Sequence, residues 1–106
     1  MSDWVVVCKE EALPPGRHRV VEINGTEVAI INVDGRYYAI EDRCTHDGAE
    51  IASGHIEGEA IVCPRHGARF CLKTGRALTP PAYEDLHVFP VRVENGTIQV
   101  QDDRLR

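Results

Sequence analysis

Two short stretches of the chain decide its fold: "RCTHDGAE" at residues 43–50 and "VCPRHGARF" at residues 62–70. Each stretch contributes one cysteine and one histidine, spaced as Cys44-x-His46 and Cys63-x-x-His66. Thiolates and imidazoles at this spacing suit an iron–sulfur cluster, zinc or copper, and they do not suit magnesium or calcium. The two stretches are therefore predicted to be the halves of one metal site.

Turn residues accompany both Cys–His pairs. Asp47-Gly48 follows the first pair, Pro64 lies inside the second, and Gly67 follows it. Glycine lets the backbone approach a bulky inorganic centre and direct N–H groups at it. Because each loop supplies one cysteine and one histidine, two loops lying side by side place both thiolates on one metal and both imidazoles on another. This order favours a two-metal cluster over a single zinc ion, which has no special need of it.

Strand and turn signals surround these two stretches. Asn24-Gly25, Asp34-Gly35 and Asn95-Gly96 each separate β-prone runs, and such dipeptides are the strongest short-range signal for a β-hairpin. We therefore expect mainly antiparallel pairing. The predicted strands cover residues 4–8, 17–23, 27–33, 36–40, 60–62, 68–71, 87–93 and 97–101.

The predicted architecture is all-β. In the last hairpin, Phe89, Val91 and Val93 alternate and are expected to share one face. A short helical turn is expected at Lys9–Leu13, where Pro14-Pro15-Gly16 ends it. We predict a small antiparallel β-sandwich or barrel, interrupted by a loop-rich insert at about residues 42–82 that holds both Cys–His pairs.

Length and composition limit the possible functions. The chain has 106 residues, which predicts one domain over 1–106, and 42% hydrophobic with 27% charged residues is typical of a globular protein. The net charge of −5 argues against nucleic acid as a partner, because phosphate binding needs clustered Lys and Arg. Acidic residues gather at 41–50 and 57–59. We interpret them as a solvated surface, with a patch that steers towards basic partners as the alternative.

The sequence gives no membrane or secretion signal. Its longest apolar run, "VAIINV" at 28–33, is far below the roughly 20 residues of a membrane span. The N-terminal "MSDWVVVCKEE" has no basic start and no small-residue cleavage site, so we expect no signal peptide and a cytoplasmic protein. In that compartment, cysteines paired with histidines are better explained by metal binding than by disulfides.

The segment C-T-H…C-P-R-H-G-A-R-F resembles the two ligand boxes, C-x-H and C-x-x-H, of Rieske iron–sulfur proteins. Pro80-Pro81 is similar to the proline loop that covers the cluster in that family. The resemblance implies the Rieske fold and one [2Fe–2S] cluster, in which two histidines replace two cysteines on one iron. By position, Cys44 and Cys63 would bind the buried iron, and His46 and His66 the outer, solvent-facing iron.

Departures from the family pattern indicate the kind of Rieske protein. High-potential members of cytochrome bc and b6f complexes carry a disulfide-forming cysteine in each box, where this chain has Ala49 and Arg65. Their second box also supplies a serine and a tyrosine hydroxyl to sulfur atoms, where this chain has Ala68 and Phe70. Loss of these donors lowers the reduction potential. The high-potential members also have an N-terminal membrane anchor, which we do not expect here. The sequence therefore resembles the soluble, low-potential Rieske ferredoxins of bacterial aromatic-ring-hydroxylating dioxygenase systems.

This resemblance implies a one-electron carrier and not an enzyme in its own right. The electron donor would be a flavin-containing NAD(P)H reductase, and the acceptor would be the terminal Rieske oxygenase. Electrons would enter and leave at the His46/His66 edge. A small acidic carrier that meets two partners in turn is expected to be a monomer. The sequence offers no Ser/His/Asp set, phosphate loop or GxGxxG motif for other chemistry.

The remaining candidate residues are expected to be structural. Cys8 is interpreted as a buried thiol in a strand, and Cys71 as a packed thiol close after the second box. Trp4 is expected to pack in the core or at a sheet edge. The histidines without a partner at ligand spacing are His18, His55 and His87, and we expect these to be surface residues.

Three alternatives remain open at this stage. The first is a Rieske-like small subunit of another reductase, such as nitrite reductase. The second is a zinc-stabilised binding module without a redox role, which analysis of iron and acid-labile sulfide would distinguish. The third is a regulatory redox sensor, for which the sequence offers no output domain.

Overall fold

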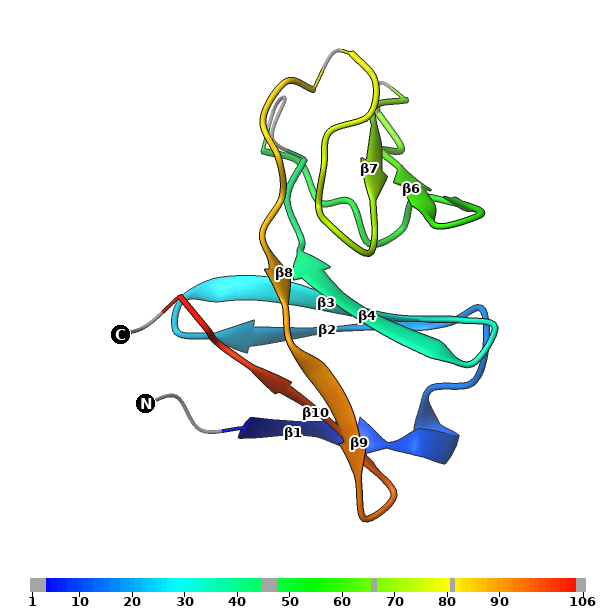
Figure 1. Ribbon diagram of the computed structural model, residues 1–106, viewed down its shortest axis with the longest axis vertical. Coiled ribbons are helices and arrows are strands. Elements are labelled where there is room, and N and C mark those ends of the chain that lie inside the picture. The colour runs from blue at the N-terminus through cyan, green and yellow to red at the C-terminus, as the bar shows by residue number, and fades with distance from the viewer. Residues whose placement is uncertain (1–3, 45–47, 66, 81, 105–106) are drawn as a thin grey trace.

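Antiparallel strands make up almost all of the regular secondary structure in the computed structural model, which describes residues 4–44, 48–65, 67–80 and 82–104 (Figure 1). One 3₁₀ helix, η1, confirms the predicted helical turn. The elements are β1 (Trp4–Lys9), η1 (Glu10–Ala12), β2 (His18–Ile23), β3 (Thr26–Val33), β4 (Arg36–Glu41), β5 (Ile56–Glu57), β6 (Ala60–Val62), β7 (Arg69–Cys71), β8 (Val88–Phe89), β9 (Val91–Glu94) and β10 (Thr97–Gln101).

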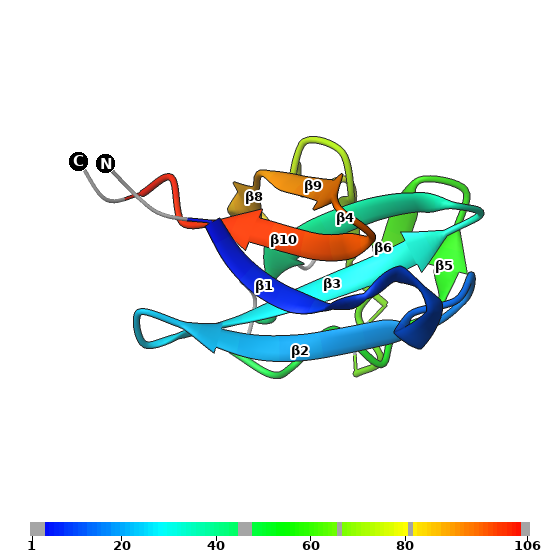
Figure 2. The ribbon, with the colours of Figure 1, turned by 90° about the horizontal axis from the view of Figure 1, so that it is seen from below.

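The strands form three antiparallel sheets. Two of them, ordered β1-β10-β9 and β2-β3-β4-β8, lie across each other as the two layers of a sandwich (Figures 1 and 2). The third, β5-β6-β7, lies at the opposite end of the molecule from β1 and β10 (Figure 1). We call residues 4–41 and 87–104 the base, and residues 42–86 the ligand region. The predicted all-β fold with a loop-rich insert is confirmed.

The three predicted hairpin turns are present. Asn24, Asp34 and Asn95 all have positive φ (50°, 53° and 54°), as do the glycines that follow them. Two successive residues with positive φ characterise the type I′ turn, whose twist matches that of the flanking strands. These two-residue turns set the register of β2–β3, β3–β4 and β9–β10.

The predicted single strand at 87–93 is wrong. Pro90 divides it into β8, which pairs with β4, and β9, which pairs with β10. Because proline has no N–H to donate to a ladder, the chain changes sheets at this residue. Phe89 is buried and Val91 packs against the same core, and Val93 lies on the same face as Val91, opposite buried Ile98, although Val93 itself is 40% exposed. The two-residue strand β5 was not predicted.

Strand β3 is buried on both faces, which explains its continuous apolar run. Val28 and Ile30 face the core of the base, together with residues of β10. Ala29 and Ile31 belong to a second core, which extends into the ligand region. A strand covered on both sides cannot alternate between apolar and polar residues.

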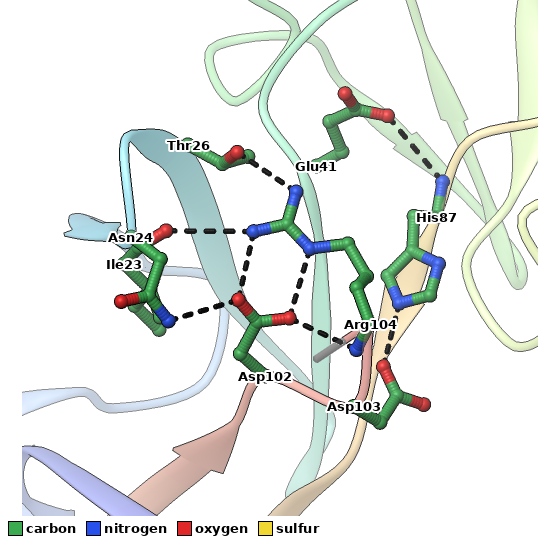
Figure 3. A network of polar contacts seen from close by, with 8 residues as sticks. All are labelled: Ile23, Asn24, Thr26, Glu41, His87, Asp102, Asp103 and Arg104. Atoms are coloured by element: carbon green, nitrogen blue, oxygen red, sulfur yellow. Dashed lines mark hydrogen bonds and ion pairs between the residues drawn. The ribbon is translucent and has the colours of Figure 1, made fainter. Parts of the chain in front are cut away.

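A polar network closes the base at its C-terminal segment (Figure 3). Asp102 is only 2% exposed and accepts hydrogen bonds from the Arg104 side chain (2.8 and 2.9 Å) and from Asn24 (3.0 Å). Hydrogen bonds from Arg104 hold the pKa of the Asp102 carboxyl well below its usual range, against the opposing effect of burial. Arg104 also donates to Thr26 (2.8 Å), so the segment after β10 is fixed to the β2–β3 turn.

The remaining aromatic and histidine predictions agree with the structure. Trp4 lies on the edge strand β1, with the Arg92 guanidinium 4.1 Å from its ring centroid. His18 is exposed on β2, and His87 contacts Asp103 at 2.7 Å on the surface. Among the described residues, no helix is long and apolar enough to cross a membrane.

Candidate metal centre

Two loops with the same backbone hydrogen bonds carry the predicted cysteine ligands. We call residues 44–49 the first ligand loop and residues 63–68 the second ligand loop. In each, the cysteine N–H donates to the carbonyl five residues later, Ala49 or Ala68, at 2.7 Å. The glycine four residues after the cysteine donates back to the cysteine carbonyl, at 2.7 Å for Gly48 and 3.0 Å for Gly67. The predicted equivalence of the two Cys–His stretches is therefore visible in the backbone.

The glycines are required by this turn. Gly48 and Gly67 have φ of +78° and +75°, a left-handed conformation that residues with a Cβ adopt at a cost. No neighbouring atom lies within 4 Å of an ideal Cβ at either position, so the constraint is conformational and not steric.

Both ligand cysteines are buried in one apolar core. Cys44 is fully buried and Cys63 is 1% exposed, and they share this core with Ile51, Phe70 and Leu72. All four cysteines of the chain are among the described residues, and none forms a disulfide. Two soft donors at equivalent positions of equivalent turns fit the thiolate half of an iron–sulfur site.

The predicted histidine ligands, His46 and His66, lie outside the described residues, as do Asp47 and Pro81. The structure therefore locates two of the four predicted ligands. Within the described part of the chain, no group of three or more His, Cys, Asp or Glu side chains is placed to hold a metal ion.

The two ligand loops differ in how their ends are joined. The second connects β6 to β7, and the pairs Val62↔Arg69 and Ile61↔Phe70 close it as a hairpin. The first follows β4 and has no such ladder. There, one carboxylate oxygen of Asp42 accepts hydrogen bonds from the N–H groups of Ile51 (2.9 Å) and Ala52 (2.8 Å). Sequence reasoning missed Asp42, whose only signal was its position two residues before Cys44.

The segment that contains Pro80 is fixed to the second ligand loop's outgoing strand. Leu78 donates its N–H to the Arg69 carbonyl (2.8 Å), and the Arg69 N–H donates to the Thr79 hydroxyl (3.0 Å). Further along, the Leu86 N–H donates to the Gly75 carbonyl at 2.7 Å. Figure 1 shows this segment at the same end of the molecule as both ligand loops.

Cys71 occupies a third turn of the same kind. Its N–H donates to the Arg76 carbonyl (2.9 Å), and Gly75 donates back to the Cys71 carbonyl (2.7 Å). Thr74 stands three residues after this cysteine, where the second ligand loop has His66. Hydrogen bonds to the thiol, chiefly from the Thr74 side chain, lower the pKa of Cys71. Cys71 and Cys8 are both partly buried, and Cys8 packs against the core of the base.

The acidic residues near the ligand loops have local partners. Glu57 contacts His55 (2.8 Å) and Arg69, and the pKa of its carboxyl is lowered first by His55 and then by Arg69. Glu59 accepts from the Tyr38 hydroxyl at 3.2 Å. His55 is therefore a surface histidine in contact with a carboxylate, as expected for a residue outside the ligand set.

This fold and site define a small iron–sulfur domain: an antiparallel β base carries two equivalent loops, each with one buried thiol. Residues 3–90 match the Rieske [2Fe-2S] domain family, and the chain belongs to that family. The resemblance seen in the ligand boxes is thereby confirmed, together with a single Rieske-type cluster as the cofactor.

Similar proteins agree in length and in fold. The ferredoxin subunit of 3-phenylpropionate/cinnamic acid dioxygenase from Photorhabdus laumondii is 44% identical, over 89% of this chain and 90% of that protein. The biphenyl dioxygenase ferredoxin subunit of Pseudomonas sp. strain KKS102 is 36% identical, over 92% and 90%.

Among solved structures, a chain of the complex of reduced oxygenase and oxidised ferredoxin in carbazole 1,9a-dioxygenase has a TM-score of 0.85 and 37% identity, covering 92% of this chain and 91% of that one. A putative NADH-dependent nitrite reductase small subunit from Mycobacterium tuberculosis has a TM-score of 0.84 and 27% identity, with 96% of both chains covered.

Proposed function

We propose that this protein is the ferredoxin component of a multicomponent aromatic-ring-hydroxylating dioxygenase. It carries one electron at a time from a flavin-containing NAD(P)H reductase to the terminal oxygenase. The observation that carries the proposal is the pair of equivalent turns that bury Cys44 and Cys63 in one core of a Rieske domain. The names of the similar proteins support the oxygenase system as its setting.

We propose Cys44, His46, Cys63 and His66 as the complete ligand set. The two buried thiols would hold the inner iron, and the two histidines the iron that faces solvent. When bound, the [2Fe–2S] cluster accepts and releases one electron.

The described residues around Cys44 and Cys63 shape that chemistry without binding the cluster themselves. The apolar neighbours of Cys44 and Cys63 exclude water from the thiol side of the site. The segment held by Arg69 and Gly75 carries exposed Pro80 and Tyr83, two uncharged side chains that suit brief contact with a partner, next to exposed Glu84 and Asp85. Weak, small interfaces are typical of redox encounters.

We further propose that residues 1–106 form one domain, with a cluster-binding insert at about 42–82, and that the protein is a cytoplasmic monomer. A monomer is the simplest state for a carrier that must present one cluster edge to two partners in turn. Size-exclusion chromatography with light scattering tests the oligomeric state.

A nitrite reductase small subunit is the second candidate, because a protein of that name shares the fold over nearly the whole chain. The two candidates have different electron acceptors. A zinc-stabilised binding module differs from both because it lacks acid-labile sulfide.

The deciding experiment combines analysis and kinetics. Iron and acid-labile sulfide are measured in the purified protein, and stopped-flow absorbance follows its reduction by a flavoprotein reductase and NADH. The reduced protein is then mixed with a terminal aromatic-ring oxygenase or with a nitrite reductase large subunit. We expect rapid oxidation by the oxygenase. Zinc without sulfide would contradict the carrier role, and oxidation by the nitrite reductase alone would replace the proposed setting.

A further inference from the structure

Asp42 is a buried carboxylate at the junction of the base and the first ligand loop. It is 9% exposed, and it follows the last residue of β4. Its own N–H donates to the Glu27 carbonyl of β3 at 2.8 Å, so its backbone is held by the base. Its side chain reaches in the other direction, to the N–H groups of Ile51 and Ala52.

This side chain takes the place of a strand ladder. The second ligand loop is closed by the paired strands β6 and β7, whereas residues 48–55 form no strand. The chain leaves the base at Asp42 and continues into the first ligand loop. After the loop, Ile51 and Ala52 return to Asp42 and donate two hydrogen bonds to one oxygen of its carboxylate. Hydrogen bonds to an ionised acceptor are stronger than those between neutral groups. Ile51 and Ala52 are both buried. If the Asp42 oxygen is removed, their N–H groups lose their hydrogen-bond acceptor at a position where little water can replace it.

We propose that Asp42 is the positioning residue of the first ligand loop, and that its buried negative charge lowers the reduction potential of the cluster. The proposal rests on the proposed function, because it takes the ligand loops to hold a cluster. Adding an electron beside a fixed negative charge is unfavourable, and a buried charge is screened less than an exposed one.

Two substitutions separate the acceptor from the charge. Asp42→Asn keeps a carbonyl oxygen that accepts from Ile51 and Ala52 but removes the charge, while Asp42→Ala removes both. Asp34→Asn is the matched control. Asp34 is exposed in the β3–β4 turn, and its positive φ suits asparagine equally well, so this variant has the same change in net charge at a remote site.

Two measurements are made on each holoprotein: hydrogen–deuterium exchange of the peptide that contains Ile51 and Ala52, and the midpoint potential by voltammetry. In Asp42→Ala we expect these amides to exchange about tenfold faster or more, because their acceptor is gone. In Asp42→Asn we expect near wild-type exchange together with a raised midpoint potential. The EPR g-values should change in Asp42→Ala and stay unchanged in Asp42→Asn.

Unchanged exchange in Asp42→Ala would overturn the positioning role. A midpoint shift in Asp34→Asn as large as that in Asp42→Asn would overturn the role of the buried charge. If Asp42→Ala does not fold, Asp42→Asn still decides, because an unchanged midpoint there contradicts the proposal. Failure of the proposed function is recognised separately by the absence of acid-labile sulfide, and the exchange arm remains valid in that case.

Discussion

The base and the ligand region are built in different ways, although one apolar core extends through both. In the base, long ladders and two-residue turns fix neighbouring strands. Strand β3 pairs with both β2 and β4, and β10 pairs with both β1 and β9. In the ligand region the strands have two or three residues, and turns and single side chains join the segments. The base is therefore stabilised by its own backbone, while the ligand region depends on few contacts.

The two apolar cores also differ, because only one of them contains proposed cluster ligands. The core of the base holds only ordinary apolar side chains such as Ile30 and Phe89. The other core includes Cys44 and Cys63, the predicted cluster ligands. A metal site whose ligands lie in a core contributes directly to folding there. We therefore expect the cluster to stabilise the ligand region much more than the base.

The largest expected effect comes from replacing a ligand. His46→Ala or His66→Ala should abolish the Rieske absorption and EPR signals, because each histidine is proposed to supply one of four ligands. The matched controls are Cys71→Ser and Cys8→Ser, which change cysteines outside the proposed set. An intact Rieske signal in either histidine variant would disprove the ligand assignment, and cluster loss in Cys71→Ser would show that the third turn also takes part.

Removing the cluster tests the comparison between the two regions directly. In the apoprotein, amides of residues 48–65 and 67–80 should exchange faster by about tenfold or more, whereas those of β3 stay protected. Hydrogen–deuterium exchange before and after treatment with acid and chelator measures both regions in one sample. Equal loss of protection in β3 would mean that the apolar core common to both regions transmits the change and that the regions are not independent.

The same difference explains how much the sequence could predict. The hairpins of the base are encoded locally, since Asn24-Gly25 and Asp34-Gly35 have positive φ at both residues. Cys44 and Cys63 could be assigned to equivalent loops because each is followed closely by a histidine and a glycine. Asp42 was missed because the N–H groups that donate to it are nine and ten residues away, and no local pattern records such a contact. The strand change at Pro90 was also missed, although proline itself was the available signal.

A third prediction concerns the base alone. Asp102→Asn should lower the free energy of unfolding by about 1.5–3 kcal/mol, because it weakens charged hydrogen bonds with Arg104, and it should leave the midpoint potential unchanged. Because folding lowers the pKa of Asp102, the stabilisation is present above the unfolded pKa of about 3.9 and is lost as the pH falls below it. Urea denaturation at pH 7 and at lower pH should therefore show a difference that shrinks in acid.

Asp103→Asn is the control for this change, because Asp103 is exposed and its carboxylate contacts His87 on the surface at 2.7 Å. Asp103→Asn should lower the free energy of unfolding by less than about 1 kcal/mol. An equal loss of stability in both variants would assign the effect to net charge and not to the buried network.

A smaller effect is expected from restoring hydroxyl groups near the cluster. The midpoint potential should lie at the low end of the Rieske range of roughly −150 to +300 mV, because Ala68 and Phe70 provide no hydroxyl donor. Ala68→Ser and Phe70→Tyr should each raise it by about 50 mV, the one-electron equivalent of about 1.2 kcal/mol of stabilisation. Both residues are fully buried, so a hydroxyl that does not reach sulfur would lower stability instead. Voltammetry and thermal unfolding together distinguish these outcomes, and a clearly positive wild-type midpoint would contradict the low-potential assignment.

The smallest expected effect concerns long-range attraction between the ligand region and basic surfaces on the reductase and oxygenase. Glu57 and Glu59 contact Arg69 and Tyr38, and Glu50 accepts from Ser53, so part of the acidic field is already offset or held locally. What remains should still accelerate association at low salt and weaken as the Debye length falls from about 30 Å at 0.01 M to about 10 Å at 0.1 M. Stopped-flow reduction by the reductase over this range should slow with salt, and Asp47→Lys with Glu50→Lys should lower the low-salt rate.

The control is Glu22→Lys, at an exposed position of β2 in the base. It changes the charge in the same direction and should have less effect on the rate per charge. If the rate is indifferent to salt, or if the base variant slows it equally, the acidic residues of the ligand region are only solvated surface, and short-range fit at the cluster end determines docking.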